Sequence, residues 1–145
     1  MLTFVSPLLH PTQRIRFLCF LLLTTLVFAL IYFGSRPEVD VVFVYLPWDK
    51  LVHATAYAGF ATLAWVALGS RSHLGAVVVA GAIGLLDEGV QYYSPRRHAD
   101  FHDLIADLAG ATIIVLLLRR MQSAEAKRQL AFGYPASDVK SSGVS

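Results

Sequence analysis

Charged residues are scarce in this sequence. Asp, Glu, Lys and Arg make up 15% of its 145 residues, whereas soluble domains contain about 25%. Hydrophobic residues make up 56%. This composition argues against an ordinary water-soluble domain and indicates a surface that faces lipid. The net charge is only +2, and we expect no nucleic-acid partner.

Cysteine is almost absent. The single cysteine, Cys19, lies inside an apolar run, so the chain cannot form an intrachain disulfide. We interpret Cys19 as a small apolar residue that faces lipid or a neighbouring helix. The chain also contains no internal repeat and no second domain.

Four segments are long enough, or nearly so, to cross a bilayer as helices. The first, residues 15–33, has no Gly, Pro or acidic residue, and its one charged residue, Arg16, lies at its start; as a helix it spans about 29 Å. A signal peptide is the competing interpretation, but no small-residue cleavage site follows Phe33. The expected helices are residues 15–33, 50–68, 74–92 and 100–118. The predicted fold is therefore all-α, an integral membrane four-helix bundle.

The third and fourth helices must carry carboxylates. Residues 74–86 are apolar but too few to span, so this helix has to continue through Asp87 and Glu88 to about Tyr92. The fourth carries Asp103 and Asp107 in its first two turns, and Gly110 follows on the same face, where a small residue allows close helix packing.

The rest of the chain is polar or ambiguous. Residues 1–14 form the N-terminus. The loop 34–46 has strand-like propensity in its second half, and we expect it to pack on the outer face or in the interface. Residues 119–145 comprise a basic juxtamembrane segment, expected to form a short helix lying against anionic lipid, and a disordered tail.

The distribution of basic residues predicts the orientation. One side of the membrane would hold eight of the twelve: Arg14, Arg16, Arg71, Arg119, Arg120, Lys127, Arg128 and Lys140. The other side would hold Arg36, Lys50, Arg96 and Arg97. Because basic residues favour the cytoplasmic side, both termini are expected to be cytoplasmic, in a multi-pass protein of the cell membrane.

This orientation brings ten polar residues to one depth, in the outer leaflet. They are Lys50, His53, Tyr57, Asp87, Glu88, Gln91, Arg97, Asp100, Asp103 and Asp107. On each helix the spacing is i, i+3, i+7 or i, i+4, which places the side chains on one face. Because charge in lipid is costly, the three polar faces should meet. The alternative is that these residues only hold the helices together.

The order of these residues closely resembles the VanZ-like family. The motif is Lys50-x-x-His53-x-x-x-Tyr57, then Asp87-Glu88-x-x-Gln91, then Arg97 followed by Asp103, Asp107 and Gly110. The resemblance covers residues 49–118. It implies a small bacterial membrane protein of the cell envelope, in a family named for a member associated with teicoplanin resistance. The family pattern has Asn where this chain has Asp107, which puts a hydrogen-bonding role at that position in question.

Two classes of function follow. The first is a protein that binds or modulates a membrane lipid or lipid-linked envelope precursor, with a possible link to glycopeptide resistance. The residues expected to bind are Lys50, Tyr57, Gln91, Arg97, Asp103 and Asp107. The second is an enzyme acting on a phosphate-bearing headgroup, with His53, Asp87 and Glu88 as acid–base groups.

Several features bear on the choice between these classes. A divalent cation on Asp87, Glu88 and Asp103 would fit either class. The sequence lacks a P-loop, a Ser-His-Asp elbow, a paired-His metal motif and a recognised lipid-phosphatase pattern, which weakens the enzyme hypothesis. A proton or ion pathway is less favoured because the acidic residues collect near one face. The oligomeric state does not follow from the sequence.

Overall fold

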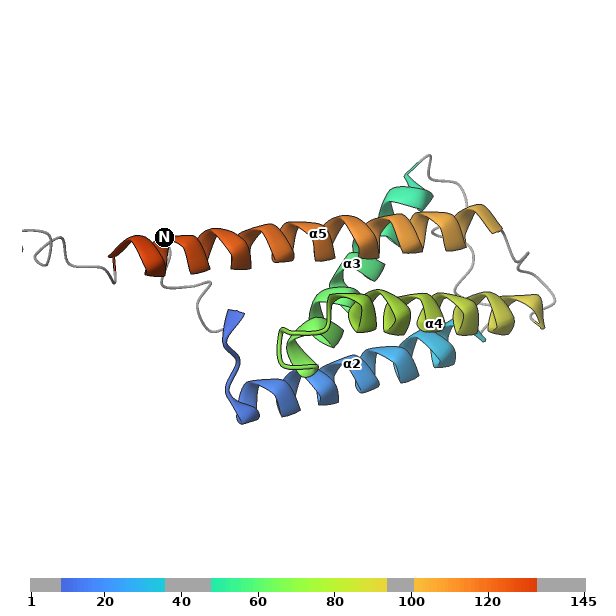
Figure 1. Cartoon of the computed structure of the whole chain (residues 1–145). Helices are drawn as coiled ribbons and strands as arrows, with labels where there is room; N and C mark the ends of the chain where they lie inside the picture. The colour runs from blue at the N-terminus through green and yellow to red at the C-terminus, as the bar shows by residue number, and fades with distance from the viewer. Residues whose placement is uncertain (1–8, 36–47, 94–100, 133–145) are drawn as a thin grey trace, which may run out of the picture.

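The structure is a bundle of α-helices. The computed structural model describes residues 9–35, 48–93 and 101–132. Its labelled helices are α2 (Gln13–Gly34), α3 (Asp49–Ala67), α4 (His73–Tyr92) and α5 (Phe101–Phe132) (Figure 1). The described ranges contain no strand, so the all-α prediction is confirmed. The loop 34–46 and the end of the chain lie largely or wholly outside these residues, as do Arg97 and Asp100.

The helix boundaries agree with the prediction except at the end of α5. As predicted, α4 continues through Asp87 and Glu88 to Tyr92. The expected separate helix after Leu118 is wrong, because α5 continues unbroken to Phe132. Residues 111–132 contain no Gly or Pro and are rich in good helix formers. In Figure 1 the last turns of α5 project beyond the other three helices.

Three of the helices are long and apolar enough to cross a membrane. They are Gln13–Phe33, His73–Tyr92 and Phe101–Arg128. The helix α3 is less apolar, and it packs against α2, α4 and α5. Its Tyr57, Trp65 and Val66 are almost completely buried. The central position of α3 shields polar side chains that would be costly in lipid, and its expected crossing of the membrane stays a prediction.

The outer surface is apolar, as a lipid-facing surface must be. On α2, large hydrophobic side chains such as Phe17, Leu18 and Phe28 are more than half exposed. The hydroxyls of Thr24 and Thr25 donate to the backbone oxygens of Phe20 and Leu21 at 2.9 Å. These polar groups are thus satisfied within α2 itself, as a hydrocarbon environment requires.

The helices alternate in direction, which gives the bundle two distinct ends. The start of α2, the end of α3, the start of α4 and the C-terminal part of α5 lie towards one end (Figure 1). We call it the Gly69 end, after the turn between α3 and α4. The opposite end holds the starts of α3 and α5 and the ends of α2 and α4. We call it the Lys50 end.

The closest helix contact joins α3 to α5. A Cβ atom added at Gly110 would collide with the backbone carbonyl of Ala54. Only a residue without a side chain allows the two backbones to approach this closely. The predicted close packing at Gly110 is confirmed, and it sets the separation of the helices that carry most of the polar residues.

Candidate functional site

An ion pair joins the first turns of α3 and α5. Lys50 Nζ donates to Asp103 Oδ1 at 2.7 Å. The side chain of Lys50 is 54% exposed, whereas that of Asp103 is 10% exposed. The cation thus lies at the mouth of the Lys50 end and the carboxylate lies beneath it. Such charge-assisted hydrogen bonds are among the stronger ones in proteins.

His53 lies one turn deeper on α3, between two carboxylates of α5. Its Nδ1 is 3.1 Å from Asp107 Oδ1, and its Nε2 is 3.9 Å from Asp103 Oδ2. An ionised carboxylate only accepts hydrogen bonds, so Nδ1 carries the hydrogen when Asp107 is charged. This leaves Nε2 as the nitrogen that gains or loses a proton. The imidazole also stacks on Tyr57, with the ring planes 6° apart.

Tyr57 extends the cluster to α4. Its hydroxyl donates to Asp87 Oδ2 at 3.4 Å, and Gln91 Nε2 donates to the same oxygen at 3.1 Å. Gln91 reaches Asp87 because residues four apart face the same side of a helix. The polar faces of α3, α4 and α5 therefore meet, as the spacing predicts.

Among the described residues, the buried carboxylate oxygens Asp87 Oδ1 and Asp107 Oδ2 have no hydrogen-bond partner. Gly84 on α4 makes room for the second, since a Cβ there would lie 3.1 Å from it. Buried polar atoms are nearly always paired. The described part of the site therefore has an excess of acceptors, which a proton, a donor from a ligand or another part of the chain could satisfy.

The charge of the described part of the site is also unbalanced. Among the described residues, three buried aspartates, Asp87, Asp103 and Asp107, face one lysine and one histidine. A helix bundle that needed only adhesion would be expected to match its charges, because an unmatched buried charge is costly. The described residues of the site therefore carry more acidic than basic charge.

The structure brings together seven of the predicted site residues. They are Lys50, His53, Tyr57, Asp87, Gln91, Asp103 and Asp107. Glu88 follows Asp87 on α4 and is partly buried. Within the described ranges, no group of three or more His, Cys, Asp and Glu side chains is arranged to hold a metal ion. In the described ranges, Asp87, Glu88 and Asp103 are thus not arranged as ligands of a divalent cation.

Sequence reasoning missed a second set of polar contacts, at the Gly69 end. Gln122 of α5 donates to the backbone oxygen of Ser70 at 2.7 Å, and Arg16 of α2 donates to that of Ala67 at 3.2 Å. The Gly-Ser dipeptide after α3 signalled a turn, but nothing in the spacing identified these partners.

Comparison with known proteins identifies the family. The family model described as VanZ/LLP1 matches residues 3–122. The chain belongs to the VanZ/LLP1 family. The match includes the seven residues that meet at the Lys50 end and Gln122 at the Gly69 end. No curated protein and no solved structure gave a significant match. The apolar helices and the family together describe a VanZ/LLP1-family membrane protein.

Proposed function

We propose that this VanZ/LLP1-family protein binds the headgroup of a cell-envelope lipid or lipid-linked precursor at its Lys50 end, in the outer leaflet of the cytoplasmic membrane. Binding there would modulate access to the lipid and so affect processes such as glycopeptide resistance. The observation that carries the proposal is the buried, unevenly charged cluster of Lys50, His53 and three aspartates.

An apolar groove on the outward face of α3 suits the apolar part of such a ligand. It has a volume of about 500 Å³ and is lined by Trp48, Leu51, Val52, Thr55 and Ala56. These residues lie at the start of α3, as Lys50 and His53 do, but on the opposite face of the helix. A molecule with a charged headgroup and a long hydrocarbon chain would place its headgroup at Lys50 and its chain in the groove.

The two kinds of group at the site recognise different parts of a headgroup. Lys50 remains more than half exposed, so its ammonium can meet a phosphate while one of its hydrogens is held by Asp103. The unpartnered oxygens of Asp87 and Asp107 can accept from hydroxyl or amino groups. Glycosylated or amine-bearing lipid phosphates carry both features.

Native mass spectrometry in mild detergent tests this proposal. The wild-type protein should retain a phosphate-bearing lipid, and Lys50→Gln and Asp87→Asn should retain less of it. The control is Glu125→Gln, which removes a partly buried acid of α5 at the other end of the bundle. Wild-type protein that purifies without lipid, or equal retention in all four proteins, would refute the proposal.

The pairing of His53 with Asp107 favours one second candidate, an enzyme acting on the same class of headgroup. Asp107 would orient the imidazole, Nε2 would act as general base or nucleophile, and Asp87 or Glu88 would supply the acid. His53→Asn should then abolish turnover of a bound lipid while the lipid is still retained. Equal lipid composition in cells with wild type and His53→Asn would exclude this candidate.

Stability measurements separate both candidates from a purely adhesive cluster. If the cluster only holds helices together, Glu88→Gln and His53→Asn should lower the melting temperature, because buried partners are left unsatisfied. If it binds a ligand, the same changes should remove the envelope phenotype with little loss of stability.

A further inference from the structure

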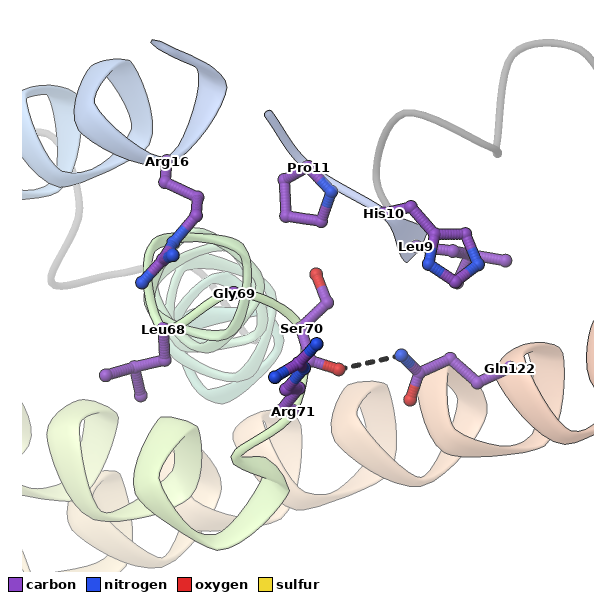
Figure 2. Close-up of a pocket in the computed structure, with 9 residues that line it drawn as sticks. All are labelled: Leu9, His10, Pro11, Arg16, Leu68, Gly69, Ser70, Arg71 and Gln122. Atoms are coloured by element: carbon purple, nitrogen blue, oxygen red, sulfur yellow. Dashed lines mark hydrogen bonds between the residues drawn. The ribbon is translucent and has the colours of Figure 1, made fainter. Parts of the chain in front are cut away.

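A second pocket lies at the Gly69 end, far along the bundle from Lys50. Its volume is about 490 Å³, and it is lined by residues near the start of α2, by the turn between α3 and α4, and by α5 (Figure 2). The residues that matter for its chemistry are His10, Arg16, Ser70, Arg71 and Gln122. This lining contains two arginines and no carboxylate.

A rigid turn shapes one wall of the pocket. The amide of Ser70 donates to Trp65 O and that of Gly69 to Val66 O, both at 2.9 Å. This pair of backbone hydrogen bonds defines a Schellman motif. It requires a left-handed backbone at Gly69, whose φ is 79°, and Ser70 is left-handed as well, with a φ of 59°. Ser70 is buried, and its carbonyl is fixed by the amide of Gln122 (Figure 2).

Arg16 is held beside this turn. Its Nε donates to Ala67 O and its Nη1 to Gln13 Oε1, both at 3.2 Å. These contacts use two of the five N–H donors of the guanidinium. The group lies against Gly69, where an added Cβ would meet its Cζ at 3.3 Å. A pre-positioned guanidinium binds an oxyanion at a lower entropic cost than a free one.

Arg71 supplies a second guanidinium. It is exposed, and no described carboxylate pairs with it. A separate groove of about 440 Å³, on another face of α5, contains Arg119, Arg120 and Lys127. The lining of the pocket is therefore basic, and Glu125 lies in an adjoining cleft that shares Leu9, His10 and Gln122 with it.

We propose that the pocket lined by Arg16 and Arg71 is a phosphate-binding site. Guanidinium groups bind phosphate oxygens bidentately, and the Gln122 and His10 side chains add further polar surface. The pocket lies at the first turn of α2 and at the turn between α3 and α4, where we expect lipid headgroups, and basic pockets of this kind attract anionic lipids. The phosphate can belong to such a lipid or to a free anion.

The test measures the melting temperature of the purified full-length protein in neutral detergent. Short-chain phosphatidylglycerol, short-chain phosphatidylcholine or inorganic phosphate is titrated in. Phosphatidylglycerol should stabilise the wild type more than phosphatidylcholine does. In Arg71→Gln the half-saturating concentration of phosphatidylglycerol should be at least about fivefold higher than in the wild type. This corresponds to about 1 kcal/mol of binding free energy for one basic residue at the membrane surface.

Arg14→Gln is the matched control. Arg14 lies two residues from Arg16 on the same helix, carries the same charge, is exposed and does not line the pocket. Removal of the Arg14 charge should leave the half-saturating concentration of phosphatidylglycerol within about twofold of the wild-type value. Arg16→Gln should behave like Arg71→Gln. If Arg16→Gln fails to fold because the contact with Ala67 is lost, the result with Arg71→Gln still tests the proposal.

The two probes distinguish the source of the phosphate. Stabilisation by inorganic phosphate that depends on Arg71 assigns the site to a free anion, and stabilisation by phosphatidylglycerol alone assigns it to a lipid headgroup. The proposal is overturned if neither probe stabilises the wild type. It is also overturned if Arg14→Gln weakens binding as much as Arg71→Gln, or if Arg71→Gln has no effect.

Discussion

At the scale of single residues, the Lys50 end depends on how a few carboxylates are satisfied. Asp107 is 1% exposed and lies against His53 Nδ1, while its second oxygen has no partner in the described part of the chain. The VanZ-like pattern has Asn at this position. An amide oxygen can replace the carboxylate oxygen that His53 contacts, but it cannot supply the charge.

Substitution of Asp107 tests which property matters for folding. We expect Asp107→Asn to melt near the wild-type temperature, because His53 keeps an acceptor. Asp107→Leu should lose about 1–3 kcal/mol, because His53 is left without a partner. Thermal unfolding in detergent measures both. A leucine variant as stable as the asparagine variant would show that the His53 contact contributes nothing to stability.

The pair of Lys50 and Asp103 gives a second prediction at this scale. A double-mutant cycle with Lys50→Met and Asp103→Asn should show a coupling of about 0.5–1 kcal/mol, since Asp103 is buried but Lys50 is half in solvent. Additive effects in unfolding experiments would mean that Asp103 is neutralised by another group, and Arg97 is the first to examine.

The sequence predicted the polar faces but not the partners. The i, i+3, i+7 spacing correctly placed Lys50, His53 and Tyr57 on one face. It could not show that His53 would meet Asp107 and Tyr57 would meet Asp87, because partner choice depends on how far each helix is rotated and shifted along its axis. Those quantities are set by packing between distant segments, here by the contact of Gly110 with Ala54.

At the scale of elements, the contact between α3 and α5 controls the site. Gly110→Ala should force the two helices apart, because its Cβ would overlap the carbonyl of Ala54. Overpacking of this kind costs about 1–3 kcal/mol, and it should also weaken the contacts of His53 and Lys50 with α5. The measurement is melting temperature together with lipid retention.

Gly59→Ala provides the control for this prediction. Gly59 is an exposed glycine of α3, and a Cβ there would meet no atom within 4 Å. Alanine is the better helix former, so this variant should be as stable as the wild type or slightly more so. If Gly110→Ala is equally benign, the backbones of α3 and α5 do not need their close approach.

Helix lengths were predictable to different degrees. The spans of α2, α3 and α4 followed from hydropathy and from Gly, Pro and polar turns at their ends. The end of α5 was placed at Leu118, where the composition becomes basic. That change marks the edge of the apolar span, but Arg, Lys, Gln and Ala also favour helix, and so the helix itself runs on to Phe132.

At the scale of the whole molecule, the two ends of the bundle differ in charge. The described residues of the Lys50 end bury aspartates among few cations, whereas those of the Gly69 end present Arg16, Arg71 and the basic turns of α5, with Glu125 as an acid on α5. In a bundle that crosses a bilayer, these two ends lie on opposite sides of the membrane. Because basic residues favour the cytoplasmic side, this asymmetry predicts that the aspartate cluster faces outwards.

Single cysteines test that orientation in a Cys19→Ala background. Ser35 ends α2 at the Lys50 end, and Ser123 is exposed on α5 near the Gly69 end. A membrane-impermeant thiol reagent should label Ser35→Cys in intact cells, with any outer membrane permeabilised. Ser123→Cys should react only after the cytoplasmic membrane is opened.

The same reagent should label Ser94→Cys in intact cells, as it labels Ser35→Cys. Ser72→Cys and Ser137→Cys should be protected, as Ser123→Cys is. The reverse pattern would place the aspartate cluster inside the cell, where an outer-leaflet lipid could not reach it.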